Sequence, residues 1–327
     1  MNLKRTVKNM FARVTGERLW RVLRRPMLAP RQYQRLIAQT EAMVLLKEDP
    51  RRLDESYWAH MLRMYAHIVD KGVQRCDWEA GHSAQCHALA KEALSHIPPA
   101  RLHEDPSMIW ALRTIEEYER RQCNGVAPTP REPVPPSRCG YDDLVDTIKT
   151  RRSIRTYIDK PLDAQTIGKI VEVINWSATS CNRQTARVFV AASPEVASQC
   201  LKTCGGATCF SDNVPAFFAF CSDTRSYSMP EEIFLPHVDV CLGVQNCCLA
   251  AHALGVSITL LSWARNTPAD EIELRRILGI PEYCQIIVAG AAGYPMFATP
   301  APHRKSVEET LTIIQRPLGE LRTGVEG

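Results

Sequence analysis

The amino-acid sequence predicts a chain in two parts: a small all-α domain, followed by an α/β or α+β domain built on one central sheet. Three features of the sequence lead to this prediction. Residues 30–122 carry apolar side chains at helical spacing, residues 123–140 are rich in proline, and residues 141–327 alternate short apolar strands with helices. A chain of 327 residues, 45% of them hydrophobic, has the length and the apolar material for two cores.

Residues 1–29 form a basic arm. Residues 1–35 hold ten of the 40 Lys and Arg but only one of the 36 Asp and Glu, so the rest of the chain is mildly acidic. Apolar residues recur at spacings of three and four among these bases up to Pro26, which predicts an amphipathic helix. We expect residues 1–26 to contact a membrane surface or a protein partner, and no nucleic acid. An arm that only packs on the body or frays is the alternative.

The spacing of apolar residues in the region 30–122 predicts helices. Asp105 is the expected N-cap of the last of them, with Pro106 at its first position. Six of the nine His lie in this region, but none has a metal-site spacing with an acidic residue, so we expect no metal. The earlier helices are expected at about 30–47, 53–71 and 80–96.

In the C-terminal part, the helix predicted at 237–254 is apolar nearly all round, which implies that it is buried on every side within a domain or at a subunit interface. The proline-rich stretch 123–140 before this part is expected to be a semi-rigid linker. The remaining helices are expected at 141–150, 163–174, from 194, and at 267–279, and the strands at 188–192, 216–221, 257–261 and 284–292.

The thirteen cysteines favour a reducing setting. Their number is odd, no Cys-x-x-Cys pair occurs, and no secretory signal precedes them. No apolar run approaches the roughly eighteen residues that span a bilayer. We therefore expect the protein in the cytoplasm, where its arm would allow peripheral attachment at the inner face of the membrane.

Three polar clusters stand out in the C-terminal part. Residues 151–155 place three arginines around a serine, and guanidinium groups match phosphate oxygens bidentately. Residues 178–184 offer hydroxyl and carboxamide groups, which can bond to the edge of a heteroaromatic ring. The basic residues 302–305 are candidates for a second arm of a phosphate site. A solvated helix end, a polar turn and a charged loop are the respective ordinary alternatives.

These clusters, in this order, resemble the nitroreductase family of flavin enzymes over residues 141–315. No single motif is specific, but five in register are. They are Arg151-Arg152-Ser153-Ile154-Arg155, Ala178-Thr179-Ser180-Cys181-Asn182-Arg183-Gln184, Asp239 with Gln245-Asn246, Ala251-His252-Ala253-Leu254-Gly255-Val256, and Gly293-Tyr294-Pro295 followed by Arg304-Lys305.

The resemblance implies an α+β fold with a central mixed sheet flanked by helices, which binds FMN. It also implies an intertwined homodimer whose central helices pack against each other, with each flavin at the subunit interface. Arg151, Arg152 and Ser153 would hold the ribityl phosphate, and Arg304 and Lys305 would close that site.

At the other end of the cofactor, the resemblance assigns Arg155 to the N1/O2 edge of the flavin. Ser180, Asn182 and Gln184 would contact the ribityl chain or the pyrimidine ring. A cationic group beside N1/O2 stabilises negative charge that develops there.

Leu261, Ser262 and Trp263 match the loop whose backbone passes the flavin N5 in this family. An acid or glycine followed by glycine is usual there, so Trp263 is the clearest departure, and we expect its bulk to narrow or cap the substrate side. Ala178 and Thr185-Ala186 also replace a usual proline and a usual Pro-Trp pair.

The implied function is that of an FMN-dependent oxidoreductase that passes hydride or electrons between NAD(P)H and an unidentified small organic acceptor. Tyr227, Phe234 and His237 are candidates to line the substrate pocket, with His237 either a proton donor or a structural residue at a helix start. Two alternatives stay open. One is a biosynthetic flavin dehydrogenase or oxidase with no nicotinamide step, and the other is a flavin-binding or scaffold protein without catalysis.

Overall fold

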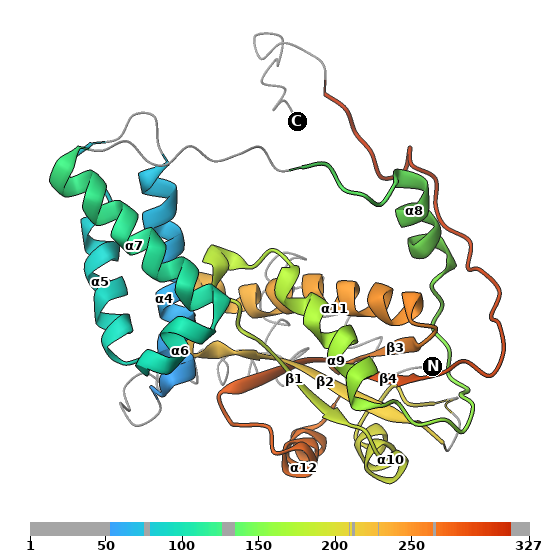
Figure 1. Cartoon of the computed structure of the whole chain (residues 1–327). Helices are drawn as coiled ribbons and strands as arrows, with labels where there is room; N and C mark the ends of the chain where they lie inside the picture. Colours follow the sequence, from blue (N-terminus) through green and yellow to red (C-terminus); the bar gives the residue numbers. More distant parts are fainter. Residues whose placement is uncertain are drawn as a thin grey trace, which may run out of the picture.

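The computed structural model describes residues 53–74, 79–125, 135–208, 210, 213–227, 229–263 and 266–314 (Figure 1). The basic arm at 1–29 and the helix expected at 30–47 lie outside these residues. Where the chain is described, helices cover both faces of one sheet and a cluster of further helices packs at one end of it, which confirms the predicted α+β class.

The N-terminal helices begin where the sequence offers capping groups. The carboxylate of Asp54 accepts hydrogen bonds from two backbone N–H groups at the start of α4, and Asp105 caps α7 in the same way. Their apolar faces share one core, which includes Leu62 and Met108. The short helix α6 was not predicted. The bounds are α4 Glu55–Val73, α5 Ala84–Ser95, α6 Pro99–Glu104 and α7 Pro106–Asn124.

The central sheet has the strand order β1-β2-β4-β3, and every strand pair in the described chain is antiparallel. The mixed sheet that we expected is therefore not what these strands form. In Figure 1, α10 (Pro194–Lys202) and α12 (Pro268–Leu278) are seen end-on while the strands run across the view, so these helices cross the strands instead of returning along them. The strands are β1 Ala186–Ala191, β2 Ala216–Asp223, β3 Ser257–Ser262 and β4 Cys284–Gly293.

One core lies on each face of the sheet. The face that carries Phe218 and Phe220 packs against α9 and α11, and the face that carries Phe217 and Cys221 packs against α10 and α12. Because β2 is covered on both faces, every one of its side chains is buried, which explains its apolar run from Ala216 to Cys221. The bounds are α9 Ala164–Glu172, η2 Val173–Trp176, α10 Pro194–Lys202, α11 Leu235–Ala253 and α12 Pro268–Leu278.

Helix α11 divides its apolar surface between two environments. Val240, Val244 and Cys247 are buried against the sheet, whereas Val238 and Leu242 are half exposed on the opposite face. A Cβ atom at Gly243 would lie 2.4 Å from the Ile174 side chain, so this glycine lets η2 approach the helix backbone. Of the helices that the structure describes, the one running through Glu231–Ala253 is long and apolar enough to cross a membrane, but here it lies against the sheet.

A buried polar network joins α4 to the end of β2. Arg225 is fully buried and donates to both carboxylate oxygens of Asp223, at 3.0 and 2.6 Å, and to the hydroxyl of Ser56, at 2.6 Å. Its guanidinium group also lies 3.1 Å from the carboxylate of Asp54 and 3.6 Å from the centre of the Tyr283 ring. The N-terminal helices are thus attached directly to the sheet.

Candidate flavin site

The arginine cluster at 151–155 is held by its one apolar residue. Ile154 is buried, its N–H donates to the Ser257 hydroxyl at 3.2 Å, and its carbonyl oxygen accepts from Thr259 at 2.5 Å and from Tyr157 at 2.7 Å. These contacts fix the backbone beside β3, at the end of α8 (Tyr141–Thr150). Because Ile154 points inward, its neighbour Arg155 is left exposed.

Within the described part of the chain, no carboxylate lies within ion-pair distance of the guanidinium groups of Arg151, Arg152 or Arg155. Arg152 donates to the carbonyl oxygens of Lys149 and Arg151, but its Nε is buried without a partner. Clustered cations with an unsatisfied buried donor suit a phosphate group, which is dianionic and accepts several hydrogen bonds. The residues present therefore fit the phosphate end of FMN.

The second cluster has an unusual backbone. Cys181, Asn182 and Gln184 have φ values of 51°, 56° and 54°, the left-handed region that side chains other than glycine seldom adopt. The turn is secured by Asp239, whose Oδ1 accepts from both the N–H of Ser180, at 3.0 Å, and its hydroxyl, at 2.8 Å. Such strain persists where surrounding contacts enforce it, and it gathers at binding sites.

A buried chain of hydrogen bonds supports Asp239 from below. Its Oδ2 accepts from the Tyr227 hydroxyl at 2.8 Å, which lies 2.8 Å from Thr185, and Thr185 in turn lies 2.9 Å from Ser222. Burial, followed by the charge of Asp239, raises the pKa of Tyr227. Because Tyr227 is fully buried, the expectation that it lines a substrate pocket is wrong for this chain, and it supports the turn instead.

The remaining substrate-side candidates differ in how far they are buried. The Trp263 ring is buried together with Leu261 in the core on the α10 and α12 face of the sheet. It therefore does not cap an open substrate side as we expected. Of these three neighbouring residues, only Ser262 is exposed. Phe234 is exposed. His237 is half buried, and its Nδ1 has no hydrogen-bond partner among the described residues. Burial lowers its pKa, which disfavours the protonated form that a proton donor needs.

One chain does not bring the predicted clusters together. Thr150, next to the arginine cluster, lies 2.8 Å from His252 at the end of α11, whereas Ser180 contacts Asp239 near its start. At 1.5 Å per residue, these two points of the helix are about 20 Å apart. Arg304 and Lys305 lie on an exposed extended segment, and the structure joins them to neither cluster.

Asp239 is the site residue whose role the sequence did not disclose. It belongs to one of the motifs, but nothing in the sequence showed that its carboxylate binds a serine 59 positions earlier. Its one visible signal was a carboxylate in an otherwise apolar helix, since a buried charge requires a partner.

The nitroreductase family profile matches residues 148–208 and 201–294 of this chain. A Staphylococcus haemolyticus protein named NADPH-dependent oxidoreductase is 30% identical over 169 residues, which cover 47% of this chain and 65% of that protein. A Bacillus subtilis protein named FMN reductase is 24% identical over the same length and is covered to 66%. This chain therefore spans slightly less than two thirds of these relatives.

Among solved structures, an FMN-dependent nitroreductase from Clostridium difficile is similar with 18% identity and a TM-score of 0.45, over 53% of this chain and 99% of that one. The profile match includes the clusters at 151–155 and 178–184 and ends at Tyr294, before Arg304 and Lys305. Residues 148–294 of this chain are thus similar to the nitroreductase family.

Proposed function

We propose that this protein is an FMN-dependent oxidoreductase that passes electrons between NAD(P)H and a small organic acceptor. The observation that carries the proposal is the arginine cluster at 151–155, which combines uncompensated charge with the unpartnered buried Nε of Arg152. The names of the relatives, an NADPH-dependent oxidoreductase and an FMN reductase, support the same chemistry.

The residues of the chain would bind and orient the cofactor. Arg151, Arg152 and Ser153 would hold its phosphate, and Arg155 would place a positive charge beside its ring system. FMN, when bound, supplies the two-electron chemistry. The turn at Ser180–Asn182, locked by Asp239, would present fixed polar groups, because its hydrogen bonds already hold it in a strained backbone form.

A homodimer would complete this site. The half-exposed face of α11, with Val238, Cys241 and Leu242, is an apolar surface without a cover in one chain. In a two-fold dimer that pairs this face with itself, the start of one α11 lies beside the end of the other. The turn at 180–184 of one subunit would then face the arginine cluster of the second, which overcomes their separation of about 20 Å along the helix.

Two further surfaces support an intertwined arrangement. Helix α8 has no buried residue and exposes Tyr141, Leu144 and Ile148. The C-terminal segment exposes Leu311 and Ile314. Apolar side chains on segments that leave the body of a subunit are typical of arms that cover a partner. If the two subunits exchange these segments, Arg304 and Lys305 would also come close to a phosphate site.

A cytoplasmic location, with peripheral attachment of residues 1–26 to the inner face of the membrane, remains part of the proposal. Each base near an anionic leaflet contributes about 1 kcal/mol. Sedimentation with anionic vesicles should pellet the full chain but not a chain that starts at Pro30. Equal pelleting of both would refute the attachment.

The decisive experiment begins with the colour of the purified protein. Stoichiometric FMN should copurify or bind on addition, and anaerobic titration with NADPH or NADH should bleach its absorbance. Protein that remains colourless with excess FMN contradicts the proposal as a whole. Flavin that binds but is not bleached by either nicotinamide contradicts only the nicotinamide step, and leaves a flavin enzyme with another electron donor.

A further inference from the structure

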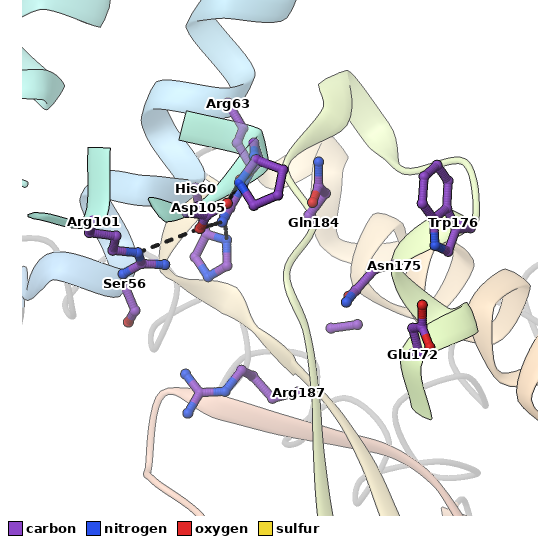
Figure 2. A pocket seen from close by; sticks show the side chains of 13 residues that line it. Ser56, His60, Arg63, Arg101, Asp105, Glu172, Asn175, Trp176, Gln184 and Arg187 are labelled. Carbon is purple, nitrogen blue, oxygen red and sulfur yellow. Dashed lines mark hydrogen bonds and ion pairs between the residues drawn. The ribbon is translucent and has the colours of Figure 1, made fainter. Parts of the chain in front are cut away.

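A cavity of about 710 Å³ lies between the N-terminal helices and the edge of the sheet (Figure 2). Its walls come from α4, α6, α7, η2 and β1, and it shares only Gln184 with the predicted flavin contacts. We propose that this cavity binds a small organic anion that carries a planar group. Its volume falls within the range of about 300–1,000 Å³ that small-molecule sites occupy.

Arg63 supplies a buried cation. Its Nε donates to the Ser107 hydroxyl at 2.9 Å. Its Nη1 lies 3.5 Å from His60 Nδ1, a nitrogen that also lies 3.0 Å from the carbonyl oxygen of Arg183. A contact of 3.5 Å is at the long limit of a hydrogen bond, so the guanidinium group is only weakly paired through Nη1.

The burial of Arg63 makes weak pairing of its charge costly. The residue is 8% exposed, and burial lowers its pKa to about 10 although Asp105 opposes the shift. The Asp105 carboxylate is 3.5 Å from Arg63 and 3.6 Å from Arg101, so two guanidinium groups share it. An anionic ligand beside Arg63 would supply the negative charge that this wall lacks.

Arg187 adds a cation at the base of the cavity. It is half buried on β1, and no carboxylate lies within ion-pair distance of it in the described ranges. Of the three guanidinium groups in the lining, Arg101 pairs with Glu55 at 2.6 Å and shares Asp105 with Arg63. Arg187 is therefore the cation that favours an anion over a neutral or a cationic ligand.

The opposite wall selects the planar group. Trp176 is 82% exposed and faces the cavity across from Arg63 and Asp105, with Asn175 beside it (Figure 2). A planar group that covers this ring would bury apolar area and gain the favourable contact of stacked π systems. The acidic end of the same molecule would then reach Arg63 or Arg187.

Isothermal titration calorimetry of the full chain tests this proposal with two probes of equal shape, 2-naphthoate and the uncharged 2-naphthamide. We expect naphthoate to bind and naphthamide to bind at least tenfold more weakly, because a charge-assisted hydrogen bond is lost. Arg187→Gln and Trp176→Ala should each weaken naphthoate binding about tenfold or more, whereas Trp176→Phe should largely retain it.

Arg276→Gln, which removes an exposed guanidinium group on α12, serves as the matched control and should leave the affinity unchanged. The absence of any heat of binding with naphthoate at millimolar concentration would overturn the proposal. Unchanged affinity in both Arg187→Gln and Trp176→Ala overturns it too, because the probe then sits elsewhere. The proposal does not rest on the flavin, and the flavin content of each variant, which should stay at the wild-type level, reports separately on the proposed function.

Discussion

Replacing Asp223 with alanine should destabilise the folded chain by about 3–5 kcal/mol, the usual cost of leaving one member of a buried ion pair alone. Asp223 and Arg225 are both fully buried, with 2.6 Å between their closest charged atoms. Without Asp223, the guanidinium group still lies 3.1 Å from the Asp54 carboxylate, but that side chain is half exposed and therefore a weaker partner.

The pKa of Asp223 gives a second route to the magnitude. Burial alone would raise this pKa, but hydrogen bonds and charges from His60 and Arg225 outweigh burial and lower it from 3.8 to about 2. A shift of this size corresponds to ~2.4 kcal/mol at 1.36 kcal/mol per unit. Because the folded-state pKa is the lower one, this stability is complete above pH 4 and is lost as the pH falls towards 2.

Urea unfolding at pH 7 measures the difference, with Glu273→Ala as the control because it removes an exposed ion pair with Arg276 and should cost less than about 1 kcal/mol. The double variant Asp223→Ala with Arg225→Met should recover much of the loss, since it also removes the buried charge that has lost its closest carboxylate partner. Equal unfolding free energies for Asp223→Ala and the control would refute the reasoning. So would a double variant that is less stable than Asp223→Ala alone.

Three further outcomes are expected. Arg151→Ala combined with Arg304→Ala should give folded but mostly colourless protein, because each lost phosphate contact costs about 1.5–3 kcal/mol; stoichiometric flavin in the purified variant would contradict the phosphate assignment. Gly243→Ala should lower the free energy of unfolding by about 1–3 kcal/mol in thermal unfolding, because its Cβ would lie 2.4 Å from an isoleucine of η2. Gly168→Ala, whose Cβ would meet nothing within 4 Å, is the control and should be neutral or stabilising. Leu242→Asp should give monomers by light scattering and lower flavin occupancy, and a dimeric variant with full flavin would exclude this face as the interface.

The sequence by itself determined the elements whose causes are local. Asp105 followed by Pro106 begins a helix because their side chains satisfy or remove N–H groups at that helix end, and the structure begins α7 there. The apolar run of β2 identifies a strand that is covered on both faces. Each of the motifs around Arg151 and Ser180 lies within a few residues of chain. They could therefore be recognised without the fold, and they indicated the resemblance to the family.

The tertiary structure alone decided which distant residues meet. All four strands pair antiparallel, and the periodicity of the helices between them carries no record of strand direction. Trp263 and Tyr227 look like pocket residues in sequence, yet both are buried. An aromatic side chain gains similar free energy in a core or against a ligand, so residue type alone does not distinguish the two environments.

The contacts of Asp239 with Ser180 and of Arg225 with Ser56 join residues 59 and 169 positions apart. Neither contact follows from residue type or spacing, because the pairing energy is realised only after the whole chain has closed the loops between them. For the same reason the cavity beside Arg63 and Trp176 was invisible in the sequence: its walls come from the two parts of the chain on either side of the proline-rich stretch, and only their packing creates it.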